Sequence, residues 1–440
     1  MNVLPDELRT WVDAAVATVD GDALLDLTAR MVDISSPTGE EREIAVFLAD
    51  FMHESGLEAH YQPLDTNQGN AIARARGEGS GPDLMIYAPL DTAFAGDPDE
   101  DEPWIDLDQR RDQIPEAIVE DGVVTGLGAH NPKGHGACAI MAAVALKRAD
   151  VPLKGDVIVG LGAGGMPTNY RGNDGGRARH DIGHGSGCAF MLEQGVRGDF
   201  AIISKPGPVS FEEVGLCWFR VRVKGLLGYA GTRHIMKHRN PIIDAAKVIE
   251  GLEAWFPEYT ARNSSGTVGP QGSIGCIRGG WPNKPTFIPE ACDIYLDLRV
   301  SPRTDPVDVK RQFAEAMAGI LERNQDIDLD WEMMLAIPGS HTDENNWIVQ
   351  STIRAWQDMT GTTYNAGTGG SGATEANILR AWGVPTARIG LPQPPHPLAH
   401  TGMFSMGEVH VDSLTKLTKA LITAAVDTCC RSTGDVGLDG

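Results

Sequence analysis

The feature that most constrains the fold of this chain is a regular alternation of short apolar segments with helix-length segments. Buried strands are predicted at residues 83–88, 155–161 and 200–204, because each is a short apolar run bounded by Gly, Pro or polar residues. Helices are predicted between them, at 134–147 and near 187–194. This order predicts an α/β domain with a mainly parallel sheet and helices on both faces. Its ligand site is expected at the carboxyl ends of the strands.

A helix and two further strands are predicted before this alternation. Residues 38–41 (Thr-Gly-Glu-Glu) have the form of a capping box, and apolar residues follow at helical spacing until Gly56. Short alternating segments at 57–62 and 70–75, separated by Gly, Pro and Asn, indicate strands.

The pattern changes between residues 211 and 334. Strands at 217–223, 291–299 and 327–332 and helices at 240–255 and 306–323 predict a small α+β sandwich there. Helices and a strand then return, at 347–359, 373–382, 386–389 and 413–428. We therefore expect a discontinuous α/β domain at 1–210 and 335–440, interrupted by an inserted α+β domain at 211–334.

Composition limits the partners of the chain. There are 37 Lys and Arg residues against 60 Asp and Glu, a formal net charge of −23, which argues against nucleic acid and anionic membranes as partners. No apolar run is long enough to cross a membrane, and the first residues lack the features of a secretory signal. Five of the seven Cys residues stand singly without C-x-x-C spacing, which indicates reduced thiols, and the adjacent Cys429 and Cys430 are interpreted as an incidental pair. These features predict a cytoplasmic protein.

Several motifs, in the order of these segments, resemble those of the aminoacylase, carboxypeptidase and desuccinylase family of dinuclear-zinc amidohydrolases. They are 87–92 (YAPLDT), similar to the family's H-x-D segment; 126–134 (GLGAHNPKG), similar to G-x-G-x-x-D-x-K-G; 228–232 (GYAGT), similar to G-H-A-G-T; 287–290 (FIPE), similar to the tail of N-x-I-P-D; 297–299 (DLR), similar to D-x-R; and 369–376 (GGSGATEA), similar to a glycine-rich turn before a late helix. The resemblance implies a catalytic α/β domain, an inserted lid or dimerisation domain, and a homodimer formed through that domain.

The positions of the family's metal ligands differ in this chain. Pro89 stands where the resemblance places the first histidine, Asn131 replaces the bridging aspartate, and Lys205 falls where another carboxylate is expected. Proline offers no ligand atom, and a neutral amide or a lysine does not offset the charge of two zinc ions. We therefore predict no dinuclear zinc site. At most one ion, Zn or Mn, is expected, with Asp181 and His400 as its candidate ligands; Phe404 is the alternative to His400 at the last ligand position.

Polar residues are nevertheless abundant at the predicted strand ends. Because neutral imidazole is well suited to deprotonating water, we predict His180 as the general base, and Tyr229, at the place of the family's lid histidine, as the donor to the oxyanion. The other candidate catalytic residues are Lys133, Lys205 and Asn131, and the candidate substrate-binding residues are Arg299, Gly370, Ser371, His130 and Asp91. Arg299, the 369–372 turn and a basic segment at 234–239 predict a small anionic substrate.

The sequence is compatible with three functions. The first is a hydrolase that acts on an amide-like or amino-substituted C–N bond of a small carboxylated substrate through a remodelled, at most mononuclear metal site. The second is a metal-independent enzyme that uses acid–base or lysine chemistry, and the third is a non-catalytic binding homologue. The titratable residues at the strand ends favour an enzyme over a binding protein, although fold alone does not decide function.

Overall fold

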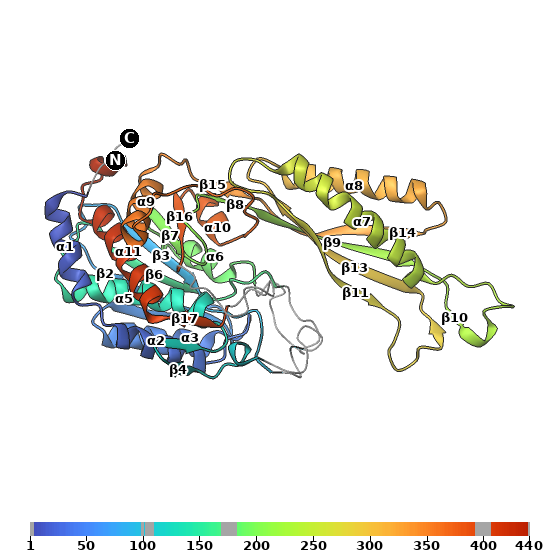
Figure 1. Ribbon diagram of the computed structural model, residues 1–440, viewed down its shortest axis with the longest axis horizontal. Coiled ribbons are helices and arrows are strands. Elements are labelled where there is room, and N and C mark those ends of the chain that lie inside the picture. Colours follow the sequence, from blue (N-terminus) through green and yellow to red (C-terminus); the bar gives the residue numbers. More distant parts are fainter. Residues whose placement is uncertain (1–3, 98–100, 102–109, 169–182, 392–405, 439–440) are drawn as a thin grey trace. The chain divides into compact units, whose positions relative to one another are not determined.

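The computed structural model describes residues 4–97, 101, 110–168, 183–391 and 406–438, which form two compact units (Figure 1). Unit 1 comprises Met1–Phe211, Thr342–Asn365 and Thr374–Gly440, and unit 2 comprises Glu212–His341 and Ala366–Ala373. The sequence placed the two boundaries after residues 210 and 334. None of the helices in the described ranges is long and apolar enough to cross a membrane.

Unit 1 is built on a six-stranded sheet in the order β1-β2-β6-β3-β7-β16. Its strands are β1 (Glu58–Pro63), β2 (Gly69–Ala75), β3 (Leu84–Pro89), β6 (Val157–Gly162), β7 (Phe200–Ser204) and β16 (Thr386–Ile389). Strands β6, β3, β7 and β16 run parallel to one another, whereas β1 and β2 pair antiparallel at one edge. The predicted fold class, an α/β fold with a mainly parallel sheet, is confirmed.

Helices cover both faces of this sheet because successive side chains of its buried strands point to opposite sides. Ile86 packs with Val159 in the larger apolar core of the unit, together with residues of α2, α5 and α11. Met85 and Tyr87 pack in the opposite core with residues of α6 and α10. The helices of unit 1 are α1 (Asp6–Val16), α2 (Gly21–Asp33), α3 (Arg42–Glu54), α5 (His135–Arg148), α6 (Ser186–Glu193), α9 (Trp347–Thr360), α10 (Ala376–Ala381) and α11 (Val411–Cys429).

Shorter elements complete unit 1. They are the strands β4 (Ile118–Glu120), β5 (Val123–Thr125) and β17 (Glu408–His410), which form a small sheet, and the helical turns η1 (Arg111–Gln113), η2 (Ala129–Gly134) and η5 (Gly434–Val436).

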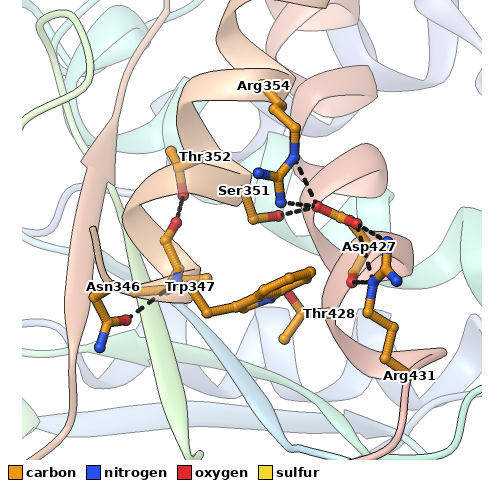
Figure 2. Close-up of polar contacts among 9 residues, drawn as sticks. Asn346, Trp347, Ser351, Thr352, Arg354, Asp427, Thr428 and Arg431 are labelled. Atoms are coloured by element: carbon orange, nitrogen blue, oxygen red, sulfur yellow. Dashed lines mark hydrogen bonds and ion pairs between the residues drawn. The ribbon is translucent and has the colours of Figure 1, made fainter. Parts of the chain in front are cut away.

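A cluster of charged side chains joins α9 to α11 (Figure 2). The buried carboxylate of Asp427 accepts hydrogen bonds from Arg354 Nη2 at 2.6 Å, Ser351 Oγ at 2.8 Å and Arg431 Nη2 at 2.8 Å. The indole of Trp347 lies 5.2 Å from the guanidinium of Arg354 and 4.9 Å from that of Arg431. The cluster therefore ties α9, which lies between the two segments of unit 2 in the sequence, to the end of α11.

Unit 2 is an antiparallel sheet with two helices. The sheet has the order β11-β13-β9-β14, and α7 and α8 supply the apolar residues that pack on one of its faces. The elements of unit 2 are β8 (Glu212–Glu213), β9 (Gly215–Lys224), β10 (Gly228–Tyr229), η3 (Ala230–Thr232), α7 (Pro241–Asn263), β11 (Gly272–Gly279), β12 (Phe287–Ile288), β13 (Ala291–Val300), α8 (Pro306–Arg323), β14 (Leu329–Ile337) and β15 (Ser340–His341).

The start of α3 differs from the prediction. The helix begins at Arg42, and no side chain caps it. The hydroxyl of Thr38 donates instead to Asp91 Oδ2 at 2.7 Å, and Glu41 Oε1 accepts from the backbone N–H groups of Gly39 and Gly164. The predicted capping box is wrong because both of its side chains bind partners outside the first turn of the helix.

Candidate active site

The carboxyl ends of four parallel strands meet at one edge of the sheet in unit 1, where ligands of such sheets bind. Asp91 follows β3, Lys205 follows β7, and residues 163–166 follow β6. Asp91 and Lys205 were both candidates from the sequence. A Cβ atom built on Gly165 would stand 3.0 Å from Asp91 Oδ1 and 2.5 Å from Glu375 Oε1, a carboxylate that contacts Lys205, so these groups lie near one another.

Asp91 is fully buried and bound by three donors. Its carboxylate accepts hydrogen bonds from Thr38 Oγ1 at 2.7 Å, Gly165 N at 2.7 Å and Met166 N at 2.8 Å. Burial raises the pKa of Asp91, while these hydrogen bonds and the ammonium of Lys205 lower it. Asp91 thus acts as an acceptor that fixes the segment after β6.

Lys205 forms a buried ion pair with a carboxylate that the sequence analysis did not select. Its Nζ lies 3.0 Å from Glu375 Oε2 and 3.2 Å from Glu375 Oε1. The side chains of Lys205 and Glu375 are 10% and 1% exposed. The attraction between two opposite charges in such close contact offsets part of the cost of desolvating them. The position where the resemblance expects a metal ligand therefore holds a cation with its own counter-ion.

Glu41, a second carboxyl group that was not among the candidates from the sequence, lies next to Asp91. It is fully buried, and its Oε1 accepts from Gly39 N at 3.0 Å and Gly164 N at 2.8 Å. Burial, and then the neighbouring charge of Asp91, raise the pKa of Glu41 to about 8. The Thr-Gly-Glu-Glu pattern had indicated only a helix cap, so no sequence signal distinguished Glu41 from an ordinary capping residue.

Two histidines, His130 and His135, are buried beside the start of α5, with their rings 5.2 Å apart in an edge-to-face arrangement. His135 Nδ1 lies 2.7 Å from the carbonyl oxygen of His130, and its Nε2 accepts from Leu391 N at 3.1 Å, so its proton is on Nδ1. The ring nitrogens of His130 have no hydrogen-bond partner among the described residues. Burial lowers the pKa of His130 to about 4, and that of His135 falls well below its usual value, chiefly for the same reason.

Lys133 and Asn131 form hydrogen bonds with groups other than the ion pair. Lys133 Nζ donates to the carbonyl oxygen of Ile34 at 2.8 Å, just beyond the end of α2, and burial lowers its pKa to about 7. Asn131 Nδ2 donates to Met406 Sδ at 3.3 Å. These contacts do not test the catalytic roles of Lys133 and Asn131, which stay predictions.

Four candidates from the sequence belong to unit 2. Tyr229 is 48% exposed, with its ring 5.7 Å from that of Phe287. Arg299 lies 3.3 Å from Asp297 as an ion pair. Gly370 N donates to Thr267 O at 3.0 Å, and Ser371 Oγ accepts from Gln271 N at 3.2 Å. The N–H of Gly370 and the hydroxyl of Ser371 are therefore engaged within unit 2.

Three further candidates lie outside the described residues. These are His180, the predicted base, and Asp181 and His400, the predicted metal ligands; Phe404, the alternative to His400, is outside them as well.

The described residues do not fit the dinuclear zinc centre that the resemblance implies. Pro89 has no ligand atom, the amide of Asn131 contacts a methionine sulfur, and Lys205 is bound to Glu375. Within the described ranges no group of three or more His, Cys, Asp or Glu side chains is arranged to hold a metal ion. A zinc pair needs several closely placed anionic and imidazole ligands, so this part of the chain does not supply one.

The chain is similar in sequence to known hydrolases and to one domain family. Residues 211–325 match the peptidase dimerisation domain of the M20 family. An N-carbamoyl-L-amino-acid amidohydrolase of Pseudomonas sp. (strain NS671) is 34% identical over 85 residues, 19% of each chain. An N-formyl-4-amino-5-aminomethyl-2-methylpyrimidine deformylase of Halalkalibacterium halodurans is 22% identical over 95% of this chain and 97% of its own. The match thus spans about a fifth of the first relative, and both relatives are hydrolases by name.

Solved structures share the fold. Human carnosine dipeptidase 1 superposes with a TM-score of 0.68 and 16% identity, over 97% of this chain and 100% of its own. A Bacillus subtilis protein described as a dinuclear metal binding peptidase from the M20 family gives a TM-score of 0.58 and 15% identity, over 92% and 97%. Residues 211–325 of the chain therefore match the M20 peptidase dimerisation domain, and the chain shares its fold with solved structures of M20 family peptidases.

Proposed function

We propose that this protein hydrolyses an amide-like C–N bond of a small carboxylated substrate, with the Lys205–Glu375 ion pair at its reacting centre. The buried contact of 3.0 Å between Lys205 Nζ and Glu375 Oε2, at the carboxyl end of β7, carries this proposal. The names of the relatives, a carbamoyl-amino-acid amidohydrolase and a deformylase, support hydrolysis of small amides. A metal pair does not enter the reaction that we propose.

The two charges of the ion pair have complementary roles in such a reaction. The carboxylate of Glu375, held by the ammonium of Lys205, accepts a proton from the attacking water. The same ammonium stabilises the negative charge that develops on the carbonyl oxygen of the substrate. The proton on Glu375 then passes to the leaving nitrogen as the C–N bond breaks. His180 and Tyr229 remain the alternative base and oxyanion donor that the sequence indicates.

Substrate recognition and assembly belong to the same proposal. Arg299 is the proposed partner of the substrate carboxylate, because a guanidinium binds a carboxylate through two hydrogen bonds. A homodimer formed through unit 2 is also proposed, since residues 211–325 match a dimerisation domain. Large apolar side chains are exposed in that range: Leu227, Tyr229, Ile235, Met236, Ile243, Trp281 and Phe287.

The function is tested with a panel of N-formyl, N-carbamoyl and N-acyl amino acids and protein freed of metal by chelation. We expect turnover of at least one class, and a loss of about 10²–10⁴-fold in Glu375→Gln, as for the removal of a positioned base. Lys205→Met should lose activity as well, while the exposed control Lys147→Met keeps it. Turnover that requires two added zinc ions and is unchanged in both ion-pair variants would refute the proposal.

A further inference from the structure

Residues 163–166, here called the strap, are held by two neighbouring carboxyl groups. Three successive backbone N–H groups of the strap donate to them. Gly164 N binds Glu41 Oε1 at 2.8 Å, Gly165 N binds Asp91 Oδ1 at 2.7 Å, and Met166 N binds Asp91 Oδ2 at 2.8 Å. The backbone of Gly164 has φ of +63°, a conformation that favours glycine. The strap is therefore fixed along its length by side chains from two distant segments.

The strap lies against the proposed reacting centre. A Cβ atom built on Gly165 would stand 2.5 Å from Glu375 Oε1 and 2.4 Å from Pro89 Cβ, so only glycine fits there. Gly164 O also accepts a hydrogen bond from Gly185 N at 2.7 Å, and a Cβ on Gly185 would stand 3.2 Å from Glu375 Cγ. The backbone of the strap therefore lies close to the Glu375 side chain, with no room for a side chain on Gly165 between them.

The carboxyl group of Glu41 accepts fewer hydrogen bonds than that of Asp91. Its Oε1 accepts both of its backbone hydrogen bonds, while Oε2 is buried and has no hydrogen-bond partner among the described residues. Asp91, in contrast, uses both oxygens and also binds the hydroxyl of Thr38. A buried oxygen without a donor is costly if it carries charge, so the arrangement favours a neutral Glu41 beside an ionised Asp91.

We infer that Glu41 is a positioning residue, which holds the strap together with Asp91 and thereby seats Glu375 against Lys205. The inference depends on the proposed function only in assigning Glu375 and Lys205 to the reacting centre. Within the described part of the chain, Glu41 hydrogen-bonds to the strap and not to the ion pair, so it acts through the backbone of Gly164.

The charge of Glu41 determines how firmly Glu41 and Asp91 together hold the strap. Its pKa is raised to about 8, first by burial and then by Asp91. Two other titratable groups in the described residues interact with this carboxyl pair. The charge of Lys205 lowers the pKa of Asp91. The pKa of Tyr87 is raised by burial and by the charges of Glu375, Asp91 and Glu41. Below pH 8 Glu41 is neutral; above it, two adjacent carboxylates repel each other and the strap loosens.

Hydrogen exchange of the full-length protein, followed by mass spectrometry on peptides covering 157–168, tests this inference without a substrate. In the wild type, protection of the strap amides should fall about tenfold between pH 7 and pH 9, after correction for intrinsic exchange, because pH 9 lies about one unit above the pKa of Glu41. Glu41→Gln keeps the acceptor oxygen without the charge, so its strap should stay protected at both values. The exposed control Glu43→Gln should behave as the wild type.

Glu41→Ala, which removes the acceptor, should lose protection of the strap at both pH values. If this variant does not fold, the comparison of wild type with Glu41→Gln decides alone. Equal protection of the strap in these two proteins at pH 9 would overturn the inference. Once a substrate is known, the decline of kcat above pH 8 should be absent in Glu41→Gln. If no substrate is turned over but the strap responds as described, the proposed function fails and the role of Glu41 in holding the strap stands.

Discussion

At the scale of single residues, the candidate site is defined by charge pairing that the sequence shows only in part. Lys205 was recognisable as a cation at a position where the resemblance expects a carboxylate. Its partner Glu375 was not, because the two residues are 170 positions apart and nothing in a single sequence indicates that they meet. Glu41 was missed for another reason, since its local pattern fits a helix cap equally well.

The first prediction concerns the pH dependence of stability. Because the pKa of Glu41 rises from 4.5 to about 8 on folding, its contribution to stability is fully present below pH 4.5 and is lost as the pH rises through 8. Glu41→Gln lacks this titration. Thermal unfolding at pH 5 and pH 8.5 should therefore show a larger fall in Tm for the wild type than for Glu41→Gln. Parallel falls in the two proteins would mean that Glu41 is ionised in the folded state.

The second prediction concerns the ion pair. Lys205→Met leaves the carboxylate of Glu375 buried at 1% exposure without its counter-ion. Breaking a buried pair in this way should cost about 3–5 kcal/mol in the free energy of unfolding. Denaturant unfolding of Lys205→Met, Glu375→Gln and the double variant forms the test, and the double variant should be more stable than Lys205→Met. Additive losses in the double variant would show that the pair is not coupled.

At the scale of elements, the strands of the main sheet and most long helices followed from apolar periodicity, whereas α1 and α2 were not predicted. Two further differences, at β11 and α7, have identifiable causes. Strand β11 was missed because its segment, GSIGCIRG, contains three glycines and has no alternating buried face. Helix α7 was predicted to end at residue 255 but continues to Asn263, past Pro257. Tyr259 in that extension is buried and donates a hydrogen bond to Arg299 O at 2.5 Å, a tertiary contact that local patterns do not reveal.

The third prediction concerns the cluster between α9 and α11. Asp427→Asn removes the charge that holds Arg354 and Arg431 and should cost about 1.5–3 kcal/mol in the free energy of unfolding, the range for hydrogen bonds to charged groups. The matched control is Asp358→Asn on α9, whose carboxylate is 52% exposed and lies 3.7 Å from Arg9. That exposed pair should contribute less than about 1 kcal/mol. Equal effects of both changes on urea unfolding would contradict a special role for Asp427.

At the scale of the whole molecule, the change of pattern near residues 211 and 334 was enough to indicate an inserted domain. An alternating α/β pattern and an antiparallel α+β pattern differ in segment order, so their boundary is visible without a structure. The last part of unit 2 was not predictable in this way. Residues 366–373 return to unit 2 after α9 because Gly370 pairs with Thr267 and Val268 through backbone contacts.

The fourth prediction concerns assembly. Ile235 is 72% exposed in the range that matches the dimerisation domain, so a buried charge at this position should weaken a dimer formed there. Light scattering after size-exclusion chromatography should give twice the chain mass for the wild type and a shift toward the single-chain mass for Ile235→Asp. Val119→Asp, a change at a 49% exposed residue of unit 1, is the control and should stay dimeric. A monomeric wild type would exclude the proposed homodimer.

The central claim is that an ion pair, and not a pair of zinc ions, lies at the reacting centre of this fold. Elemental analysis of the purified full-length protein, expressed in zinc-supplemented medium and handled without chelators, tests it most directly. We predict at most one transition-metal ion per chain, with the same content in the wild type and in Glu375→Gln, because the described strand-end residues offer no metal cluster. Two tightly bound zinc ions per chain, lost in Glu375→Gln, would contradict the account.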